Sequence, residues 1–373
     1  MRNLPLLLYI LLVLVFVLTP FTTAMTLAAP SSPDHDPLPP PTATATATPV
    51  APSVTVTATA AETAHDEVTL QLAKIEKEHH YHGMEELQSI MQTKPLKIKA
   101  YSLEDESAPS LQVGGEIIVK IVHFVRHGQG FHNLFADIYK NEGKEWTQFK
   151  NEENNPYVKM ELLDAPLTDK GRKQAQILRP RIDAFGTNKK NSSNGINSNN
   201  DNNENEKGTT SDVLDEEQTL EMVVLSTNCR ALQTGVIAFQ SYIGKVPFIA
   251  HEMIREEIGV HLCDQRRPIS SQKLEFPMVN FDLVESDEDD LFSYEERESK
   301  AGVGERIYKF MEWLELREET HVGVTSHSGW LFALFNGVVE CDENLKAWFQ
   351  TGEMRSVKLV FSRTSPPTCT ENE

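Results

Sequence analysis

The sequence predicts an α/β fold, a three-layer sandwich in which a mostly parallel central sheet carries helices on both faces. Short apolar runs typical of buried strands alternate along the chain with amphipathic helical patterns. This alternation is typical of a parallel sheet that is covered on both sides. Each apolar run leads into polar or glycine-containing sequence, as expected where a buried strand ends in a loop.

The composition excludes several classes of protein. The chain has 373 residues, of which 39% are hydrophobic, enough for one medium domain or two small ones. Its formal net charge of -20 argues against non-specific electrostatic binding of nucleic acid, so no nucleic-acid partner is expected. The four cysteines form no C-x-x-C pair, which excludes zinc-ribbon and thioredoxin-type sites. No metal site and no cofactor are predicted, and an anionic ligand requires a local basic site.

Residues 1–24 are predicted to be a signal peptide or a signal anchor. An unbroken apolar run from Leu6 to Leu18 fits the hydrophobic region of a secretory signal better than a membrane span of about 20 residues. Small residues at 22–24 would suit cleavage, whereas the apolar residues 25–29 would suit an anchor associated with a membrane. We therefore expect the protein in the secretory pathway, secreted or membrane-anchored, with a plastid or cytoplasmic location as the alternative.

The remaining chain divides by composition. Residues 25–62 are rich in proline, threonine and alanine, which cannot bury enough apolar area to order, so a disordered stalk is predicted. Residues 63–117 are expected to form a partly helical N-terminal extension before a folded domain over 118–361. An asparagine-rich stretch at 188–215 predicts a disordered insertion in that domain, and 362–373 a flexible tail.

Four apolar runs predict strands of the sheet. The strongest, from Ile117 to Val125, is nearly all isoleucine and valine. The others lie at 222–226, 246–250 and 321–325. Between them, Thr168 is a candidate N-cap of a helix that contains Pro180, which should kink or shorten it. A second amphipathic helix is predicted from Val303 to Leu314.

Three of these strands are followed by side chains suited to phosphoryl transfer. Arg126 and His127 follow the first, Arg230 lies just after the second, and His327 follows the last. In such a sheet, ligands bind beyond the carboxyl ends of the strands. Imidazole is a nucleophile, guanidinium binds phosphate, and phosphoryl transfer depends on positioning and cationic clamping. Neighbouring cations also lower the pKa of a histidine and so keep a ring nitrogen free to attack.

Four separated motifs, in order over most of residues 118–361, resemble the histidine phosphatase superfamily, which has the phosphoglycerate mutase-like fold. They are the R-H-G segment 124–133, the L-T-x-x-G-x-x-Q-A segment 167–175, the S-x-x-x-R-A-x-x-T segment 226–234 and the H-S-G turn at 326–329. The stretch 260–267 is similar to plant and algal phosphoglycerate mutase-like proteins.

The resemblance implies a role for each residue of these motifs. His127 would take the phosphoryl group covalently, and His327 would be the second catalytic histidine. The resemblance implies that the phosphoryl oxygens are held by His327, Arg126 and Arg230, with a further polar contact from Asn133. Water would then hydrolyse the phosphohistidine.

The leaving alkoxide needs a proton, and the resemblance implies a donor in the segment 251–259. We choose Glu256 as the donor, with Glu257 as the competing assignment. A carboxylate donor needs a raised pKa, which a site rich in arginine and histidine does not obviously provide.

The predicted function is hydrolysis of a phosphomonoester, carried by a small metabolite or a phosphoprotein, through phosphohistidine on His127. One alternative is a phosphoglycerate mutase-type phosphotransferase, but the stretch after Glu256 lacks the His-Tyr-Gly that follows the acid in mutases. A second alternative is an inactive, membrane-tethered binding module. The presence of all the motif histidines and arginines argues against it.

Other residues suggest more modest roles. Arg266 and Arg267 would either recognise a second anionic group or form a solvated pair that neutralises nearby acids. The acidic residues 286–290 are expected to be solvated surface and not a calcium site, because they lack the glycine and the terminal glutamate of an EF-hand loop. His123 is expected in the core. The tryptophans expected to be packing residues are Trp313, Trp330 and Trp348.

Overall fold

The computed structural model describes residues 81–111, 117–141, 155–186 and 219–363. The predicted signal segment, the stalk, the insertion and all but the first two residues of the tail lie outside the described residues. Within the described ranges, no helix has both the length and the apolar character needed to span a membrane.

In the described chain, seven strands form one sheet in the order β4-β3-β5-β2-β7-β1-β6. Strand β7 runs antiparallel to both of its neighbours, β2 and β1, and the other pairings are parallel. The mostly parallel sheet is therefore confirmed. The strands are β1 (Leu96–Ser102), β2 (Ile117–Arg126), β3 (Met222–Leu225), β4 (Phe248–Ala250), β5 (His321–Ser326), β6 (Glu340–Cys341) and β7 (Met354–Arg363).

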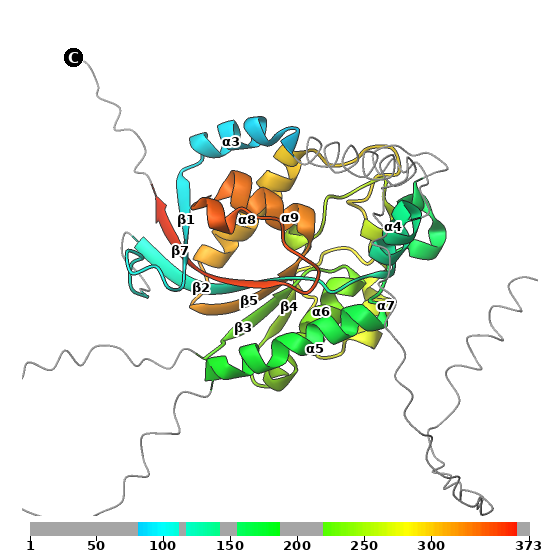
Figure 1. The fold of residues 1–373 in the computed structure, drawn as a ribbon, viewed down its shortest axis with the longest axis horizontal. Coiled ribbons are helices and arrows are strands. Elements are labelled where there is room, and N and C mark those ends of the chain that lie inside the picture. The colour runs from blue at the N-terminus through cyan, green and yellow to red at the C-terminus, as the bar shows by residue number, and fades with distance from the viewer. Residues whose placement is uncertain (1–80, 112–116, 142–154, 187–218, 364–373) are drawn as a thin grey trace, which may run out of the picture. The chain divides into compact units, whose positions relative to one another are not determined.

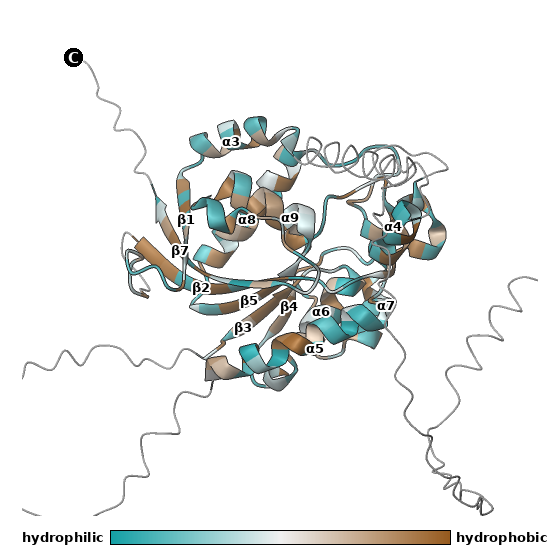
Figure 2. Ribbon diagram, in the orientation of Figure 1, coloured by the Kyte–Doolittle hydropathy of each residue, from teal (hydrophilic) through white to brown (hydrophobic). Residues whose placement is uncertain are grey.

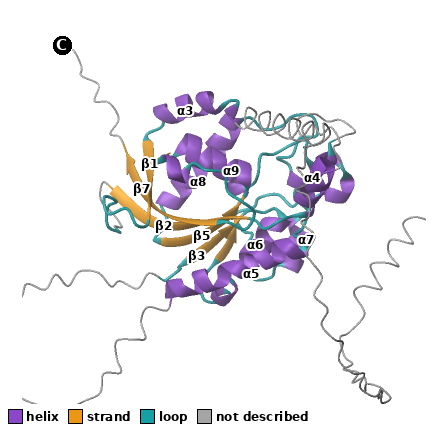
Figure 3. Cartoon of the chain, in the orientation of Figure 1, coloured by secondary structure: helices purple, strands orange, loops and turns teal. Residues whose placement is uncertain are grey.

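Helices cover both faces of the sheet, which confirms the three-layer fold. Figure 1 shows α3, α8 and α9 on one face and α5 and α6 on the other, and Figure 3 shows the same layers by element type. The helices are α3 (Met84–Thr93), α4 (Phe131–Asn141), α5 (Asp169–Asp183), α6 (Cys229–Ala238), α7 (Ile269–Glu275), α8 (Lys300–Glu315) and α9 (Ser328–Ala333).

Each face of the sheet has its own hydrophobic core. Strand β2 contributes to both, because Phe124 packs with α3, α8 and α9 while the next residue, Val125, packs with α5 and α6. Successive side chains of a strand point to opposite faces, so a strand that is apolar throughout can serve two cores. Figure 2 shows the strands as the most hydrophobic elements of the fold.

The domain begins earlier than residue 118. Helix α3 and strand β1 fall within the predicted extension, but β1 pairs with β7 from Leu96 opposite Arg363 to Ser102 opposite Val357. Leu87 of α3 is fully buried in the core beside α8. In β1 the buried apolar residues alternate with two lysines and a tyrosine, a pattern typical of a half-buried strand.

Helix α5 begins as predicted. The hydroxyl of Thr168 accepts a hydrogen bond from the backbone N–H of Gly171 at 3.1 Å, which is the expected N-cap. Pro180 does not shorten the helix, which continues to Asp183. The proline lies in the last turn, where few further backbone bonds depend on it.

Three buried histidines predict acid sensitivity of the fold. Burial lowers the pKa of His123 to about 3, with His321 and Arg181 adding to the shift, and lowers the pKa of His251 and of His321 to about 4. The rings of His123 and His321 stack with centroids 5.1 Å apart. Below pH 6.5 the unfolded chain therefore binds protons that the folded chain does not.

We expect the free energy of unfolding to fall between pH 7 and pH 5, by up to about 1.4 kcal/mol per pH unit for each such histidine. Carboxylates contribute little in this window because they titrate near pH 4. Urea unfolding at several pH values measures the slope, and His123→Phe should reduce it. An unfolding free energy that stays constant from pH 7 to pH 5 would contradict the prediction.

Candidate active site

The register of the sheet brings the predicted site residues together. Arg126 of β2 pairs with Ser326 of β5, and Thr325 of β5 pairs with Leu225 of β3. The residues that follow these three strands therefore emerge at one edge. As a result the rings of His127 and His327 lie with centroids 5.0 Å apart.

Two hydrogen bonds set the protonation of His127. Its Nδ1 lies 2.7 Å from the carbonyl oxygen of Gly128, and its Nε2 lies 3.2 Å from Nε of Arg230. A carbonyl can only accept and a guanidinium can only donate, so Nδ1 carries the proton and Nε2 keeps its lone pair. This is the tautomer that a nucleophilic Nε2 requires.

Both histidines are neutral in this environment. His127 and His327 are 1% and 0% exposed, and burial, followed by the charge of Arg230, holds the pKa of each well below its usual value. Nε2 of His327 lies 2.7 Å from the hydroxyl of Ser226, and its Nδ1 has no hydrogen-bond partner among the described residues. A buried polar atom without a partner is uncommon and marks a candidate ligand contact.

Two glycines let the loop after β2 lie against the start of α5. A Cβ on Gly128 would collide with the backbone of Gly171, and a Cβ on Gly171 would collide with the backbone of Gln129. Backbone bonds hold the approach, including the N–H of Thr168 to the carbonyl of Gln129 at 2.9 Å. The glycines of the first two motifs are thus explained by one close contact.

Arg230 has every nitrogen engaged. Its Nε donates to His127, one terminal nitrogen donates to the carbonyl of Cys263, and the other donates to Oδ1 of Asp264 at 2.6 Å. The second carboxylate oxygen of Asp264 accepts from Arg297 at 2.8 Å. Burial alone would lower the pKa of Arg230, but the Asp264 carboxylate outweighs it and the pKa is raised.

Asp264 was not among the predicted site residues. It lies in the 260–267 stretch that resembles plant proteins, which was the only signal for it. Burial would raise the pKa of its carboxyl, but Arg297 and Arg230 lower it, so the group is an anion inside the site. It is the direct partner of the arginine that touches His127.

A second buried carboxylate positions the helix that carries Arg230. Oδ1 of Asp164 accepts from the backbone N–H of Cys229, at the start of α6, at 2.8 Å. Asp164 has φ 44°, a left-handed conformation that is uncommon for a residue other than glycine. Asparagine and aspartate tolerate it best, and here the strained turn places a carboxylate at a helix N-terminus.

Arg126 and Asn133 complete the predicted binding set. One terminal nitrogen of Arg126 donates to the carbonyl of Phe349 at 2.7 Å, and its Nε has no partner among the described residues. Burial lowers the pKa of Arg126 to about 10 against the opposing charge of Glu256, so it remains a cation at neutral pH. The side-chain oxygen of Asn133 accepts from the N–H of Gly130 at 3.0 Å and so closes the turn before α4.

The two candidate proton donors differ in their contacts. The carboxylate of Glu256 accepts four hydrogen bonds of 3.1–3.2 Å, from the hydroxyl of Ser328 and the backbone N–H groups of Gly329, Trp330 and Glu257. Glu257 instead pairs with Lys300 and lies 3.7 Å from Arg297. Glu256 is therefore the carboxylate that lies beside α9, and its charge is the one that opposes the lowering of the Arg126 pKa by burial.

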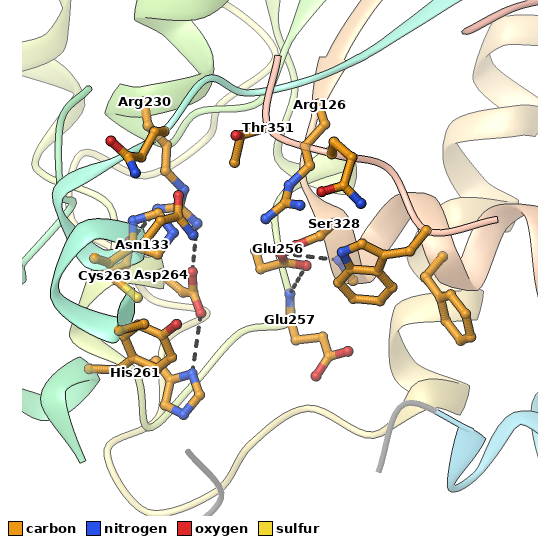
Figure 4. Close-up of a pocket in the computed structure, with 18 of the residues that line it drawn as sticks. Arg126, Asn133, Arg230, Glu256, Glu257, His261, Cys263, Asp264, Ser328 and Thr351 are labelled. Carbon is orange, nitrogen blue, oxygen red and sulfur yellow. Dashed lines mark hydrogen bonds and ion pairs between the residues drawn. The ribbon is translucent and has the colours of Figure 1, made fainter. Parts of the chain in front are cut away.

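A cavity of about 770 Å³ lies at this site, and His327 does not line it. The residues described above that do line it include Arg126, Asn133, Arg230, Glu256, Glu257 and Asp264. Figure 4 shows Arg230 and Asp264 on one side of it, and Arg126, Glu256 and Ser328 on the other. His127 does not line the cavity itself, because Arg230 lies between the two. The cavity wall therefore carries two arginines that can hold an anion, and one of them contacts the neutral imidazole of His127.

Two of the more modest predictions are wrong in part. Arg266 and Arg267 do pair with nearby acids, Arg266 with Glu252 and Arg267 with Asp164 and Glu275. Arg266 is not solvated, however, because its guanidinium is buried and also donates to carbonyls of the acidic loop 286–288. That loop is also not wholly solvated, because Asp289 is buried in an ion pair with Arg255. No group of three metal-ligating side chains occurs in the part of the chain that the structure describes.

Sequence comparison agrees with the geometry. No family model matches the chain. It is 30% identical over 246 residues to "Phosphoglycerate mutase-like protein 1" of Arabidopsis thaliana, which covers 65% of this chain and 81% of that protein. The chain belongs to the histidine phosphatase superfamily. The motif resemblance is thereby confirmed.

Other similarities to this histidine phosphatase superfamily member are weaker. "Phosphoglycerate mutase-like protein 2" of the same plant is 28% identical over 307 residues, 66% of this chain and 77% of that one. Among solved structures, a mycobacterial glucosyl-3-phosphoglycerate phosphatase has a TM-score of 0.32 at 15% identity, covering 64% and 90% of the two chains. A phosphoglycerate mutase from Thermus thermophilus has a TM-score of 0.28 at 16% identity, covering 63% and 91%.

Proposed function

We propose that this protein hydrolyses a phosphomonoester through a phosphohistidine formed on Nε2 of His127. The observation that carries the proposal is the orientation of the ring: Nδ1–H donates to the Gly128 carbonyl, and Nε2 faces the guanidinium of Arg230. A neutral imidazole with its lone pair directed at a cationic group is poised to attack a bound phosphoryl group.

The first step forms the N–P bond and breaks the P–O bond of the ester. Arg230 must first give up its hydrogen bond to Nε2 and donate to a phosphoryl oxygen instead. Among the described residues, Nε of Arg126 and Nδ1 of His327 have no hydrogen-bond partner, so these groups would hold the other oxygens. Asn133 would contribute through the turn that it closes. Cations that clamp the equatorial oxygens stabilise the charge that spreads over them.

We propose Glu256 as the group that protonates the leaving oxygen. Both glutamates line the cavity, but only Glu257 is paired with a lysine, Lys300. When Glu256 carries the proton, the Ser328 hydroxyl can accept from it, because a hydroxyl can either donate or accept. In the second step a water attacks phosphorus and gives a proton to the Glu256 carboxylate, the N–P bond breaks, and inorganic phosphate and neutral His127 are released.

Hydrolysis is favoured over mutase chemistry by the cavity. A mutase must keep its phosphohistidine dry, whereas a cavity of about 770 Å³ has room for water beside the substrate. Transfer to a second hydroxyl of a sugar acid is the competing outcome.

The test offers the full chain ³²P-labelled phosphorylated sugars, nucleotides, glycerates and phosphopeptides. We expect release of labelled inorganic phosphate from some of them, and label on the protein after quenching at alkaline pH, where phosphohistidine survives. Label that moves between positions of a glycerate without phosphate release would show a mutase. Neither release nor protein label with any ester would show a binding module.

A further inference from the structure

A strip of aromatic side chains leads from the phosphate site to the surface. The guanidinium carbon of Arg126 lies 6.0 Å from the ring centroid of Trp348. The ring of Trp348 lies 5.4 Å from that of Phe332, which lies 5.2 Å from that of Tyr81. All four side chains line the same cavity. We define Trp348, Phe332 and Tyr81 as the aromatic strip.

The outer end of the strip, Tyr81, is its most exposed part. Arg126 is 8% exposed, Phe332 is 6% exposed, Trp348 is half-buried, and Tyr81 is 50% exposed. The strip thus begins beside the proposed phosphate-binding arginine and ends at the cavity mouth. A leaving group whose phosphate lies between Arg126 and Arg230 must extend along this wall or across from it.

Trp348 is not simply a packing residue like the other tryptophans. Trp330 is fully buried, and Trp313 is a partly buried residue of the same core. Trp348 packs against the same core, but unlike the other two it also lines the cavity, and hydrogen bonds from Arg355 hold its segment in place. The guanidinium of Arg355 donates to the carbonyls of Leu345, Ala347 and Trp348 at 2.6–3.1 Å. A rigid ring loses little entropy when a ligand stacks on it.

We propose that the substrate is a phosphomonoester whose leaving group carries a planar aromatic ring, and that the ring stacks on the aromatic strip. This inference rests on the proposed function for its phosphate site. Aromatic rings pack favourably on one another, and stacking tolerates many ring types, so the shared chemistry is a planar ring. A short aryl leaving group would reach Trp348, whereas the base of a nucleoside monophosphate would reach further, toward Tyr81.

The test uses substrate pairs with matched leaving oxygens. One pair is 5′-AMP and ribose 5-phosphate, and the other is benzyl phosphate and cyclohexylmethyl phosphate. Both members of a pair release a primary alkoxide, so a difference reports the ring alone. We expect the full-length protein to favour the aromatic member by about tenfold in kcat/KM in at least one pair. Preference in the first pair indicates a nucleoside source, and preference in the second a short aryl source.

Trp348→Leu should reduce the preference about five- to tenfold, mainly through KM, because stacking contributes to ground-state and transition-state binding alike. If the substitution instead disturbed Arg126, kcat/KM would fall equally for both members of a pair. The matched control is Trp313→Leu: Trp313 is also half-buried and also packs against an arginine, Arg317, at 5.5 Å, but it lies outside the cavity. It should leave the preference unchanged. Tyr81→Leu removes the outer ring of the strip at an exposed position. Misfolding of the core therefore cannot account for a change in preference in this variant.

Binding of the same four esters to His127→Ala separates this inference from the proposed function. Tighter binding of the aromatic members without any phosphate release by the wild type would support the strip and overturn hydrolysis. Phosphate release with equal kcat/KM and equal affinity within both pairs would overturn the strip and leave hydrolysis standing.

Discussion

Replacing His127 with alanine is expected to lower kcat for phosphate release by at least about 10⁴-fold, because removing a covalent nucleophile leaves only binding and electrostatic stabilisation. No other described nitrogen has the same arrangement, with one ring nitrogen tied to a carbonyl and the other facing Arg230. The label retained after alkaline quenching should disappear as well. Steady-state phosphate release and the label together measure the effect.

The control for this variant is His321→Ala. His321 is also a buried neutral imidazole, but it lies at the start of β5, away from the cavity. Its loss should lower stability while kcat stays within about threefold, since no reacting group is touched. If His127→Ala kept activity comparable to that of His321→Ala, the nucleophile would have to be another group.

Asp264→Asn is expected to lower kcat/KM by about 100-fold. Asp264 holds Arg230 through a 2.6 Å bond between buried groups. Asparagine would remove the negative charge and place an NH2 donor against one of the two arginines, Arg230 or Arg297. Loss of one positioned donor around a developing charge typically has an effect of this size. Because Arg230 would bind the phosphoryl oxygens most strongly in the transition state, kcat should fall more than KM rises.

Asp289→Asn separates positioning from stability. Asp289 is buried to a similar degree and pairs with the buried Arg255, yet it does not line the cavity. Breaking a buried ion pair costs about 3–5 kcal/mol, so both variants should unfold at lower urea concentration. Only Asp264→Asn should lose kcat at conditions where both are folded. Equal losses of kcat would show that Asp264 acts only through the stability of the fold.

The convergence of His127, Arg230 and His327 could be predicted because it depends on local signals. Each residue follows an apolar strand, and parallel neighbours place their carboxyl ends at one edge. The glycines at 128 and 171 stood in recognisable motifs, and the structure explains them by a single backbone contact.

The residues that sequence reasoning missed depend on partners distant in the chain. Asp264 could not be distinguished from the surface acids, since its meaning comes from Arg230 and Arg297. The position of Trp348 at the cavity depends on the hydrogen bond from Arg355 to its carbonyl, in the turn before β7. Strand β1 was not predicted because its alternating lysines resemble those of a solvent-exposed segment. Its pairing with β7 shows that it is a strand of the sheet. A local pattern carries no information about such pairings.

The position of β7 affects how the protein is made. During translation β1 and β2 are synthesised early, but both pair with β7, which begins only at Met354. Until the ribosome has made that strand, the nascent chain carries two strands, the largely apolar β2 and the half-buried β1, whose facing edges have no native partner. Unpaired strand edges are sites of aggregation, and contacts between distant segments form slowly. We therefore expect the newly made chain to depend on chaperones until β7 inserts between the two strands.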